Sequence, residues 1–183
     1  MILPIYVYGT DVLREKTKEI DANYPNLEKL VKDMFETMYA SDGVGLAAPQ
    51  IGKAIRLFVV DADPLGDEYP DSKGFKKVFI NPVITDYSNE ICSMSEGCLS
   101  IPGLSESVER PKSITIKYFD ENFNPQTDTY SGFNARVVQH EYDHLEQVLF
   151  TDRLNPMRKT MIRGKLQKMS RGKIKVDYLT VSK

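Results

Sequence analysis

The sequence has very few cysteines and histidines and no long apolar run. Two cysteines among 183 residues, Cys92 and Cys98, provide no disulfide framework, so we expect free thiols or metal ligands in a reducing compartment. No apolar segment approaches the length of a membrane span, and residues 1–8 lack the basic and apolar regions of a secretion signal. We therefore expect a cytoplasmic protein that does not enter a membrane.

The remaining composition is typical of a globular protein. With 183 residues, of which 41% are hydrophobic, the chain can bury a sizeable core, and we expect one domain over residues 1–183. The net charge of −2 hides an uneven distribution, because residues 153–183 contain ten Lys and Arg but only one Asp. Such a segment can bind a polyphosphate such as RNA, or it can simply solvate the outer face of a terminal helix. Charge alone favours neither.

The spacing of apolar residues predicts an α+β fold. Helical spacing predicts three helices, over residues 26–39, 133–150 and 156–169. The polar face of the last helix is almost wholly basic, and its apolar residues are expected to dock against the body: Met157, Met161, Ile162, Leu166 and Met169.

Strand-forming runs lie between the first two helices. They predict strands over residues 55–60, 78–84 and 113–119, with a hairpin partner over 126–131 and a last strand within 174–181. Residues 95–103 contain two glycines and a proline, so we expect irregular backbone there rather than a plain strand. The middle of the chain is therefore predicted to be antiparallel.

The only two histidines, His140 and His144, form an H-E-x-x-H pattern. In a helix, residues four apart lie on one face, so both imidazoles can reach one metal ion. Glu141 then lies beside the open position of that metal, where it can take a proton from bound water. The alternative is a pair of ordinary core histidines, since a short pattern can match by accident.

A catalytic site of this kind needs a third protein ligand. The extended metzincin pattern is excluded, because positions 147 and 150 hold Gln and Phe instead of Gly and His. No glutamate follows Glu146, so Asp152 and Asp177 are the only downstream carboxylates, and a solvated carboxylate is the simpler interpretation of Asp152.

Upstream, the candidates are the cysteines. Two histidines and one cysteine form an established catalytic ligand set, which favours Cys98 in its glycine-containing segment. Cys98 can also be a small buried hydrophobic residue. A closed structural site that uses Cys92 as well is a further alternative, although the spacing of the two cysteines is wider than usual.

Residues 43–52, with the sequence G-V-G-L-A-A-P-Q-I-G, imitate a dinucleotide-binding fingerprint. A predicted helix precedes them and a strand follows, which is the reverse of the required order, so no nucleotide cofactor is expected. Gln50 offers an amide donor that can stabilise an oxyanion. A tight turn of small residues is the alternative.

Three stretches taken together resemble the bacterial peptide deformylase family. They are residues 43–52 as quoted above, 96–100 (E-G-C-L-S) and 139–145 (Q-H-E-Y-D-H-L). The similarity also takes in residues 12–14, 81–82 and 150–153, so it extends to about residue 155. The expected fold is α+β, with antiparallel β-sheets packed around a central metal-binding H-E-x-x-H helix, an N-terminal helix and a C-terminal basic helix.

The resemblance implies a role for individual residues. It implies Cys98, His140 and His144 as metal ligands and Glu141 as general base. The implied oxyanion donors are the Gln50 side chain and the Leu99 backbone N–H. The implied pocket for a methionine side chain is formed by Val44, Gly45, Glu96, Gly97, Phe133, Arg136 and Val137. Arg136 is unusual in an apolar pocket, and we expect its stem to line the pocket while its guanidinium reaches solvent or an acid.

The implied reaction removes the formyl group from the N-terminal formylmethionine of newly made polypeptides and releases formate. The enzyme would be a metallohydrolase acting on a linear amide, with one divalent ion, natively Fe²⁺; Zn²⁺, Ni²⁺ or Co²⁺ can also occupy such a site. The basic C-terminal segment could contact the ribosome. Two rivals remain: a zincin-like peptidase, which lacks its third ligand here, and a metal-stabilised RNA-binding module, which gives Glu141 and Gln50 no role.

Overall fold

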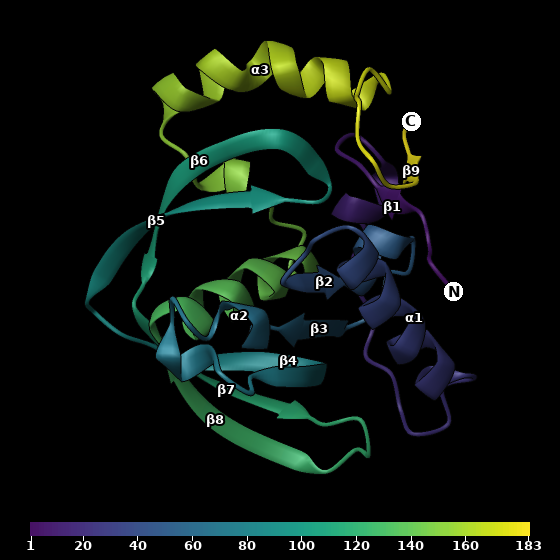
Figure 1. Cartoon of the computed structure of the whole chain (residues 1–183), viewed down its shortest axis with the longest axis vertical. Helices are drawn as coiled ribbons and strands as arrows, with labels where there is room; N and C mark the ends of the chain where they lie inside the picture. Colours follow the sequence, from purple (N-terminus) through teal and green to yellow (C-terminus); the bar gives the residue numbers. More distant parts are fainter.

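A computed structural model describes all 183 residues, and its main element is a five-stranded antiparallel sheet. The strand order is β2-β3-β4-β7-β8, and every neighbouring pair is antiparallel, as the sequence predicts. The strands are β2 (Gly45–Ala47), β3 (Leu57–Asp61), β4 (Lys76–Tyr87), β7 (Ser113–Phe119) and β8 (Pro125–Ser131). This sheet supports one side of the central helix (Figure 1).

The central helix, α2 (Gly132–Leu145), carries the H-E-x-x-H pattern and packs on this sheet. Ala135, Val138 and Leu145 are fully buried in a cluster with apolar residues of β3, β4 and β7. The prediction of a helix to residue 150 is wrong, because Gln147 adopts a left-handed conformation with φ 60° and the chain turns there. A short 3₁₀ turn, Phe150–Arg153, follows.

The hairpin of β5 (Ile91–Cys98) and β6 (Ile101–Pro111) covers α2 from the other side (Figure 1). The expectation of irregular backbone over residues 95–103 is confirmed in part: β5 runs through Cys98 and β6 begins at Ile101, but their pairing is not regular there. The register shifts between Gly97 and Cys98, a two-residue connection follows, and Gly103 on β6 has a left-handed φ of 76°. Strand β6 was not predicted, since Glu106 and Arg110 occupy buried positions on it and obscure the apolar alternation.

The first helix, α1 (Leu27–Ala40), matches its prediction to within one residue. Its buried face, which includes Val31, Met34 and Met38, packs in one cluster with residues of β2 and β3. The short strand β2 directly follows this helix, so the glycine-rich stretch lies between α1 and the sheet. That position brings residues 43–52 beside α2.

The third helix, α3 (Pro156–Ser170), is capped by Asn155, whose side-chain oxygen accepts a hydrogen bond of 2.9 Å from the Arg158 N–H. Its apolar residues Ile162, Leu166 and Met169 pack against residues of β6 and the 3₁₀ turn. The expected docking of Met157 and Met161 is wrong, because these side chains are 72% and 63% exposed.

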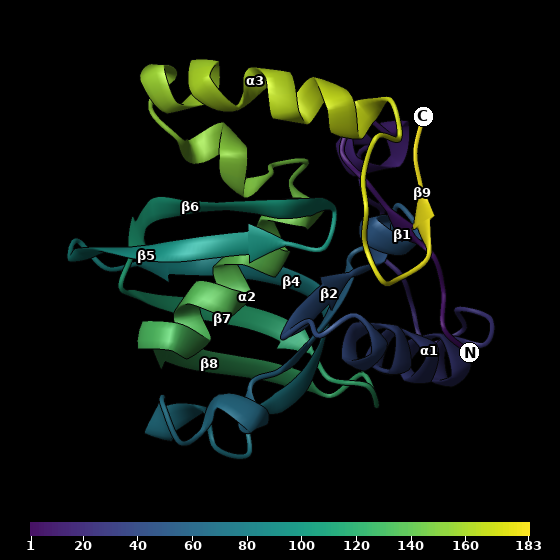
Figure 2. The same cartoon turned by 45° about the horizontal axis from the view of Figure 1, so that its top comes forward.

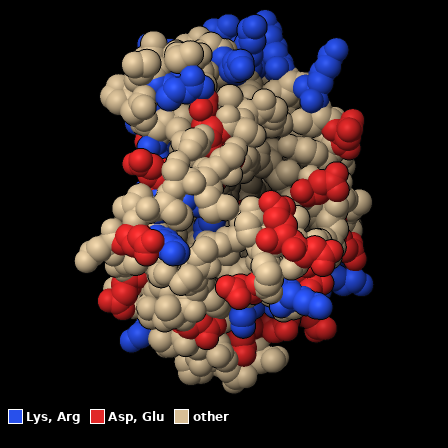
Figure 3. All heavy atoms as spheres, turned by 60° about the vertical axis from the view of Figure 1, so that its left-hand side comes forward, with Lys and Arg blue, Asp and Glu red and all other residues tan.

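Two short strands near the ends of the chain pair beside the end of α3, whereas the amino group of Met1 lies on α1, bound to Asp33 and Glu36. Strand β9 (Thr180–Val181) pairs in parallel with β1 (Ile5–Tyr6), and Figure 2 shows them side by side. The strand predicted within residues 174–181 is therefore confined to its last two residues. Lys and Arg side chains gather at the top of Figure 3, where α3 lies. This helix is part of the basic segment, residues 153–183, seen in the sequence. None of the helices has the length and apolar character needed to cross a membrane.

Candidate active site

Cys98, His140 and His144 come together at the centre of the molecule. The hairpin β5–β6 places Cys98 at the end of β5, against the face of α2 that bears both histidines. One ligand atom from each of the three residues lies within 4.8 Å of the others, and Cys98 Sγ is 3.4 Å from His144 Nε2. This is the only group of three such residues in the structure that could hold a metal ion.

The other candidate ligands lie elsewhere. Asp152 binds Arg14 at 2.5 Å, and its side chain is 37% exposed. Cys92, at the far end of β5, accepts a hydrogen bond of 3.5 Å from Arg136. The geometry therefore disagrees with a closed site that would use both cysteines.

A divalent metal ion fits this cluster on the chemistry of its donors. A thiolate and two imidazoles are ligands that Zn²⁺, Fe²⁺ and similar ions accept. His140 Nδ1 is engaged with Glu96 Oε1 at 2.8 Å, which leaves Nε2 of the same ring for a metal. Burial lowers the pKa of His144 well below its usual value, so this imidazole is neutral, as a metal ligand must be.

Glu96 is the centre of a buried network of charges. Its carboxylate accepts hydrogen bonds of 2.6 and 2.9 Å from Arg110 and of 2.7 Å from Arg136, in addition to the contact with His140. Burial would raise the pKa of Glu96, but the hydrogen bonds from His140 and Arg110 outweigh it and lower this pKa strongly. Glu96 is therefore ionised, and it fixes the orientation of the His140 ring.

The buried network of charges extends from Arg110 to Asp143 on α2 and to Arg153. Arg110, which is 2% exposed, also donates to Asp143 at 2.8 Å, and Asp143 in turn accepts two hydrogen bonds from Arg153, of 2.6 and 2.7 Å. These charges tie β6, α2 and the 3₁₀ turn together. Sequence reasoning missed this network: Asp143 and Arg153 lie in stretches that carry the resemblance, but nothing in the sequence pairs them with each other or with Arg110.

Glu141, unlike Glu96, has no arginine bound to its carboxylate. Its residue is only 4% exposed, and its Oε2 atom has no hydrogen-bond partner. Burial is the main reason that the pKa of this carboxyl is raised to about 7. Gly45 lies against it, so closely that a Cβ atom at position 45 would be 2.7 Å from Glu141 Oε1. The glycine is thus required by the close approach of β2 to this side chain.

Gln50 is fixed beside Cys98 by three contacts. Its Oε1 atom accepts a hydrogen bond of 2.9 Å from the Ala47 N–H, and its Nε2 atom donates to Ser100 Oγ at 3.1 Å and to Cys98 Sγ at 3.5 Å. Because the side chain is almost fully buried, its amide is held in one orientation, pointing to the cysteine.

A cavity of about 460 Å³ opens beside this cluster. It is lined by every predicted site residue except His144, which is 2% exposed. Those lining residues are Val44, Gly45, Gln50, Glu96, Gly97, Cys98, Leu99, Phe133, Arg136, Val137, His140 and Glu141. The guanidinium of Arg136 turns to an acid, Glu96, and to the Cys92 and Val108 carbonyls. Val176 and Tyr178 from the C-terminal segment also line the cavity, which no motif in the sequence indicated.

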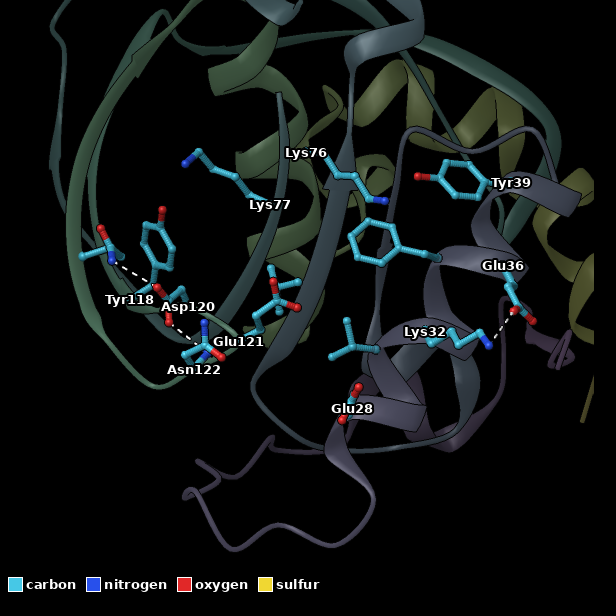
Figure 4. Close-up of a pocket in the computed structure, with 14 residues that line it drawn as sticks. Glu28, Lys32, Glu36, Tyr39, Lys76, Lys77, Tyr118, Asp120, Glu121 and Asn122 are labelled. Atoms are coloured by element: carbon cyan, nitrogen blue, oxygen red, sulfur yellow. Dashed lines mark hydrogen bonds and ion pairs between the residues drawn. The ribbon is translucent and has the colours of Figure 1, made fainter. Parts of the chain in front are cut away.

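A larger cavity, of about 740 Å³, lies between α1 and strands β4 and β7 (Figure 4). No histidine or cysteine lines it. Its lysines interact with neighbours: Lys76 lies 4.7 Å from the centre of the Phe35 ring, and Lys32 is 4.0 Å from Glu36. The cluster of Cys98, His140 and His144 therefore lies at the smaller cavity and not at the larger one.

Known proteins with similar sequence and structure share one name. Residues 2–160 match the family described as polypeptide deformylase. The peptide deformylase of Flavobacterium psychrophilum is 53% identical, over 97% of this chain and 95% of its own length. That of Christiangramia forsetii is 50% identical, over 97% of this chain and 94% of its own.

Solved structures agree with the sequence comparison. Peptide deformylase 1B of Arabidopsis thaliana superposes with a TM-score of 0.83 at 38% identity, covering 93% of this chain and 91% of that one. The predicted α+β fold and the resemblance seen in the sequence are confirmed. The chain belongs to the polypeptide deformylase family, whose members are metal-dependent hydrolases that remove the N-formyl group from newly made polypeptides.

Proposed function

We propose that Cys98, His140 and His144 hold one divalent metal ion and that Glu141 moves the protons during deformylation. One observation carries this assignment: the three donor atoms lie within 4.8 Å of one another, beside a buried carboxylate oxygen that has no partner. Such a carboxylate, with a pKa of about 7, is suited to accept and return a proton near neutral pH.

For the metal we propose Fe²⁺ as the native ion, as the resemblance to the family implies. Thiolate and imidazole donors also suit Zn²⁺, Ni²⁺ and Co²⁺, so these ions are expected to replace it. When bound, the ion supplies Lewis-acid activation of water and of the formyl oxygen.

The residues around the cluster are proposed to transfer the proton and to stabilise the negative charge of the intermediate. Glu141 takes a proton from the water that attacks the formyl carbon and later delivers it to the departing amine. The negative charge that develops on the formyl oxygen is stabilised by the Gln50 amide and the Leu99 N–H. Because Gln50 is already held by Ala47 and Ser100, it needs little reorganisation for this role.

The apolar part of the cavity is the proposed site for the methionine side chain. Val44, Phe133 and Val137 line it and pack in the cluster between α2 and the sheet. The stem of Arg136 and the backbones of Gly45 and Gly97 complete the wall. Both carboxylate oxygens of Glu96 are engaged by arginines and His140, so its proposed role is to hold the site rather than to bind the substrate.

The test is an anaerobic assay of the Fe²⁺-loaded protein with formyl-Met-Ala-Ser, measuring formate and the free peptide. We expect formate to be released with Met-Ala-Ser left intact. Cleavage of a peptide bond without formate would support a zincin-like peptidase instead. Loss of both metal and fold in Glu141→Ala would favour a purely structural site.

The basic helix is the proposed contact with the ribosome, in the cytoplasm where newly made chains emerge. Arg158, Lys159 and Arg163 lie on this helix, and Met157 and Met161 are exposed beside them. Binding to phosphates should weaken steeply with added salt. Co-sedimentation with ribosomes, comparing the wild type with Lys159→Gln/Arg163→Gln and with the control Lys29→Gln on α1, tests it. Equal binding by all three would contradict the contact.

A further inference from the structure

The C-terminal segment, residues 173–181, borders the active-site cavity. Ile174, Val176 and Tyr178 are half-buried, whereas the residues between them are exposed. Ile174 packs against the cluster formed by β6 and α3, and Tyr178 packs against the cluster formed by α1, β2 and β3. Val176 and Tyr178 line the cavity. The segment therefore connects two separate parts of the core across one side of the site.

Backbone hydrogen bonds hold the end of this segment in place. The Ile5 N–H donates to the Leu179 carbonyl at 2.8 Å, and the Val7 N–H donates to the Val181 carbonyl at 3.0 Å. Figure 2 shows the segment descending from α3 to this pair of strands. Because Ile5 of β1 and Val7, which follows this strand, are fully buried, the segment is firmly anchored directly after Tyr178.

Tyr178 makes one contact with the catalytic machinery. Its hydroxyl donates a hydrogen bond of 2.7 Å to the carbonyl of Leu99, the residue after Cys98. Burial, followed by the nearby charge of Cys98, raises the pKa of Tyr178 to about 12. The hydroxyl therefore keeps its proton, and remains a donor, throughout the pH range in which the enzyme would work.

The same turn has two other anchors. The Ser100 carbonyl accepts a hydrogen bond of 2.8 Å from the Tyr8 N–H, and the Ser100 hydroxyl accepts one of 3.1 Å from Gln50. The two carbonyls of the connection between β5 and β6 are thus held by the two ends of the chain, one by each. Tyr178 holds the peptide group between Leu99 and Ser100, which is one group after the one that carries the Leu99 N–H.

We propose that Tyr178 is a positioning residue for deformylation: its hydroxyl fixes the Leu99 carbonyl and so sets the orientation of the Cys98–Leu99–Ser100 turn. This inference rests on the proposed function, in which Cys98 binds the metal and the Leu99 N–H stabilises the oxyanion. Peptide groups are planar, so holding the Leu99 carbonyl removes most of the freedom of the backbone between Leu99 and Ser100. Without this bond, the ψ angle of Leu99 can change, and the turn that carries the Leu99 N–H and Cys98 Sγ can shift with it.

The test is Tyr178→Phe, which removes the hydroxyl and keeps the ring that packs on the core. Tyr24→Phe is the matched control, since Tyr24 packs against the same cluster but does not line the cavity. We expect kcat for Tyr178→Phe to fall about 3- to 10-fold, the range for loss of one neutral hydrogen bond, with KM unchanged. The loss should be equal for formyl-Met-Ala and formyl-Met-Ala-Ser, and absent in the control.

A spectroscopic measurement reports on the turn without turnover. In the Co²⁺-loaded protein, the visible absorption bands depend on the geometry of the bond between the Cys98 thiolate and the metal. We expect these bands to shift in Tyr178→Phe and to stay in place in Tyr24→Phe. Thermal melting checks the fold. If the melting temperature of Tyr178→Phe falls, Val176→Ala serves as a second variant, because it loosens the same segment and keeps the hydrogen bond. Its kcat shows how much of the loss of turnover comes from loosening alone.

Two results would overturn the inference. One is an unchanged kcat together with unchanged Co²⁺ bands in Tyr178→Phe. The other is a higher KM that appears only with the longer peptide, which would make Tyr178 a substrate contact. Glu141→Ala is assayed in parallel: undiminished turnover in that variant contradicts the proposed function, whereas undiminished turnover in Tyr178→Phe alone contradicts this inference.

Discussion

Two buried carboxylates lie next to His140, and their surroundings give them opposite properties. The residues are almost equally buried, with 6% of Glu96 and 4% of Glu141 exposed. Around Glu96, two arginines and His140 supply donors, and its pKa is lowered. Around Glu141, one oxygen has no partner, and its pKa is raised to about 7. Burial alone therefore does not set the ionisation of a carboxyl group; the donors that accompany it decide.

This difference separates a carboxylate that holds the site from one that is free to react. Glu96 cannot change its charge without leaving Arg136 buried with no carboxylate partner and Arg110 with Asp143 as its only one. Glu141 can change its charge near neutral pH, because no cation holds it. The mutations below test each half of this comparison.

The largest expected effect is on turnover in Glu141→Ala. Removing the only group placed to move protons should lower kcat by about 10²- to 10⁴-fold. The bound metal should stay at the wild-type level, because Glu141 is not one of the three ligands. Formate release and metal content, measured on the same preparation, check both.

Glu146→Gln is the control for this experiment. Glu146 directly follows α2, its side chain is 45% exposed and it pairs with Arg56 outside the cavity. Its turnover should stay within about twofold of wild type, since exposed ion pairs contribute little. Retention of full turnover by Glu141→Ala would remove Glu141 from the reaction.

Arg110→Met is expected to have the next largest effect, on stability. It leaves Glu96 and Asp143 without their shared partner, and loss of one member of a buried ion pair typically lowers the free energy of unfolding by about 3–5 kcal/mol. Arg14→Met, which breaks the half-exposed pair with Asp152, should cost about 1 kcal/mol or less. Urea unfolding of the metal-free variants measures both. Equal losses would show that the buried network is no more important than a surface pair.

Gly45→Ala should displace the Glu141 carboxylate while leaving the fold intact. The added Cβ would be 2.7 Å from both Cγ and Oε1 of Glu141, so the whole side chain has to shift. A misplaced catalytic group can lower kcat by about 10²-fold, so we expect a loss of about 10- to 100-fold with little change in melting temperature.

Gly164→Ala in α3 is the matched control, because nothing lies within 4 Å of an added Cβ there. We expect unchanged turnover in this variant. A clearly lowered melting temperature in Gly45→Ala would contradict the account. It would show that the strain lies in the backbone of β2 and not in the Glu141 side chain.

The smallest expected effect is a pH dependence of stability that comes from Glu96. Its pKa in the folded protein lies below the ordinary value of 4.5, so ionised Glu96 stabilises the fold fully above that value. This stabilisation is lost as the pH falls below 4.5 towards the folded pKa. The free energy of unfolding should therefore fall less between pH 5 and about pH 3 in Glu96→Gln than in the wild type. Parallel curves for the two proteins would contradict the lowered pKa.

The sequence predicts some parts of this molecule much better than others. Helix α1 and strand β7 were predictable because their burial has a regular period, as Val31, Met34 and Met38 illustrate for α1, and β3 and β4 because they are rich in strand-forming residues. The grouping of Cys98 with the two histidines was a hypothesis, since it depends on how a hairpin folds over α2. The H-E-x-x-H helix ends earlier than its apolar pattern suggests, because the turn at Gln147 depends on one backbone conformation.

What the sequence could not predict is mostly long-range pairing of charges and chain ends. Arg110 sits in a strand and binds residues of β5 and α2, and its partners are set by tertiary structure alone. The same holds for Tyr178, which is 79 positions from Leu99 in the chain. Glu96 was expected to touch the substrate, but its engagement with two arginines favours a structural role at the site.

The central claim, that two similar carboxyl groups differ because of their partners, is tested most directly by difference infrared spectroscopy of the metal-free protein. Subtracting the spectra of Glu141→Gln and Glu96→Gln from that of the wild type isolates the carboxyl bands of each residue. We predict that Glu141 changes from protonated to ionised near pH 7, while Glu96 is ionised at every pH above 4.5. Glu141 already ionised at pH 5, alongside Glu96, would contradict the account.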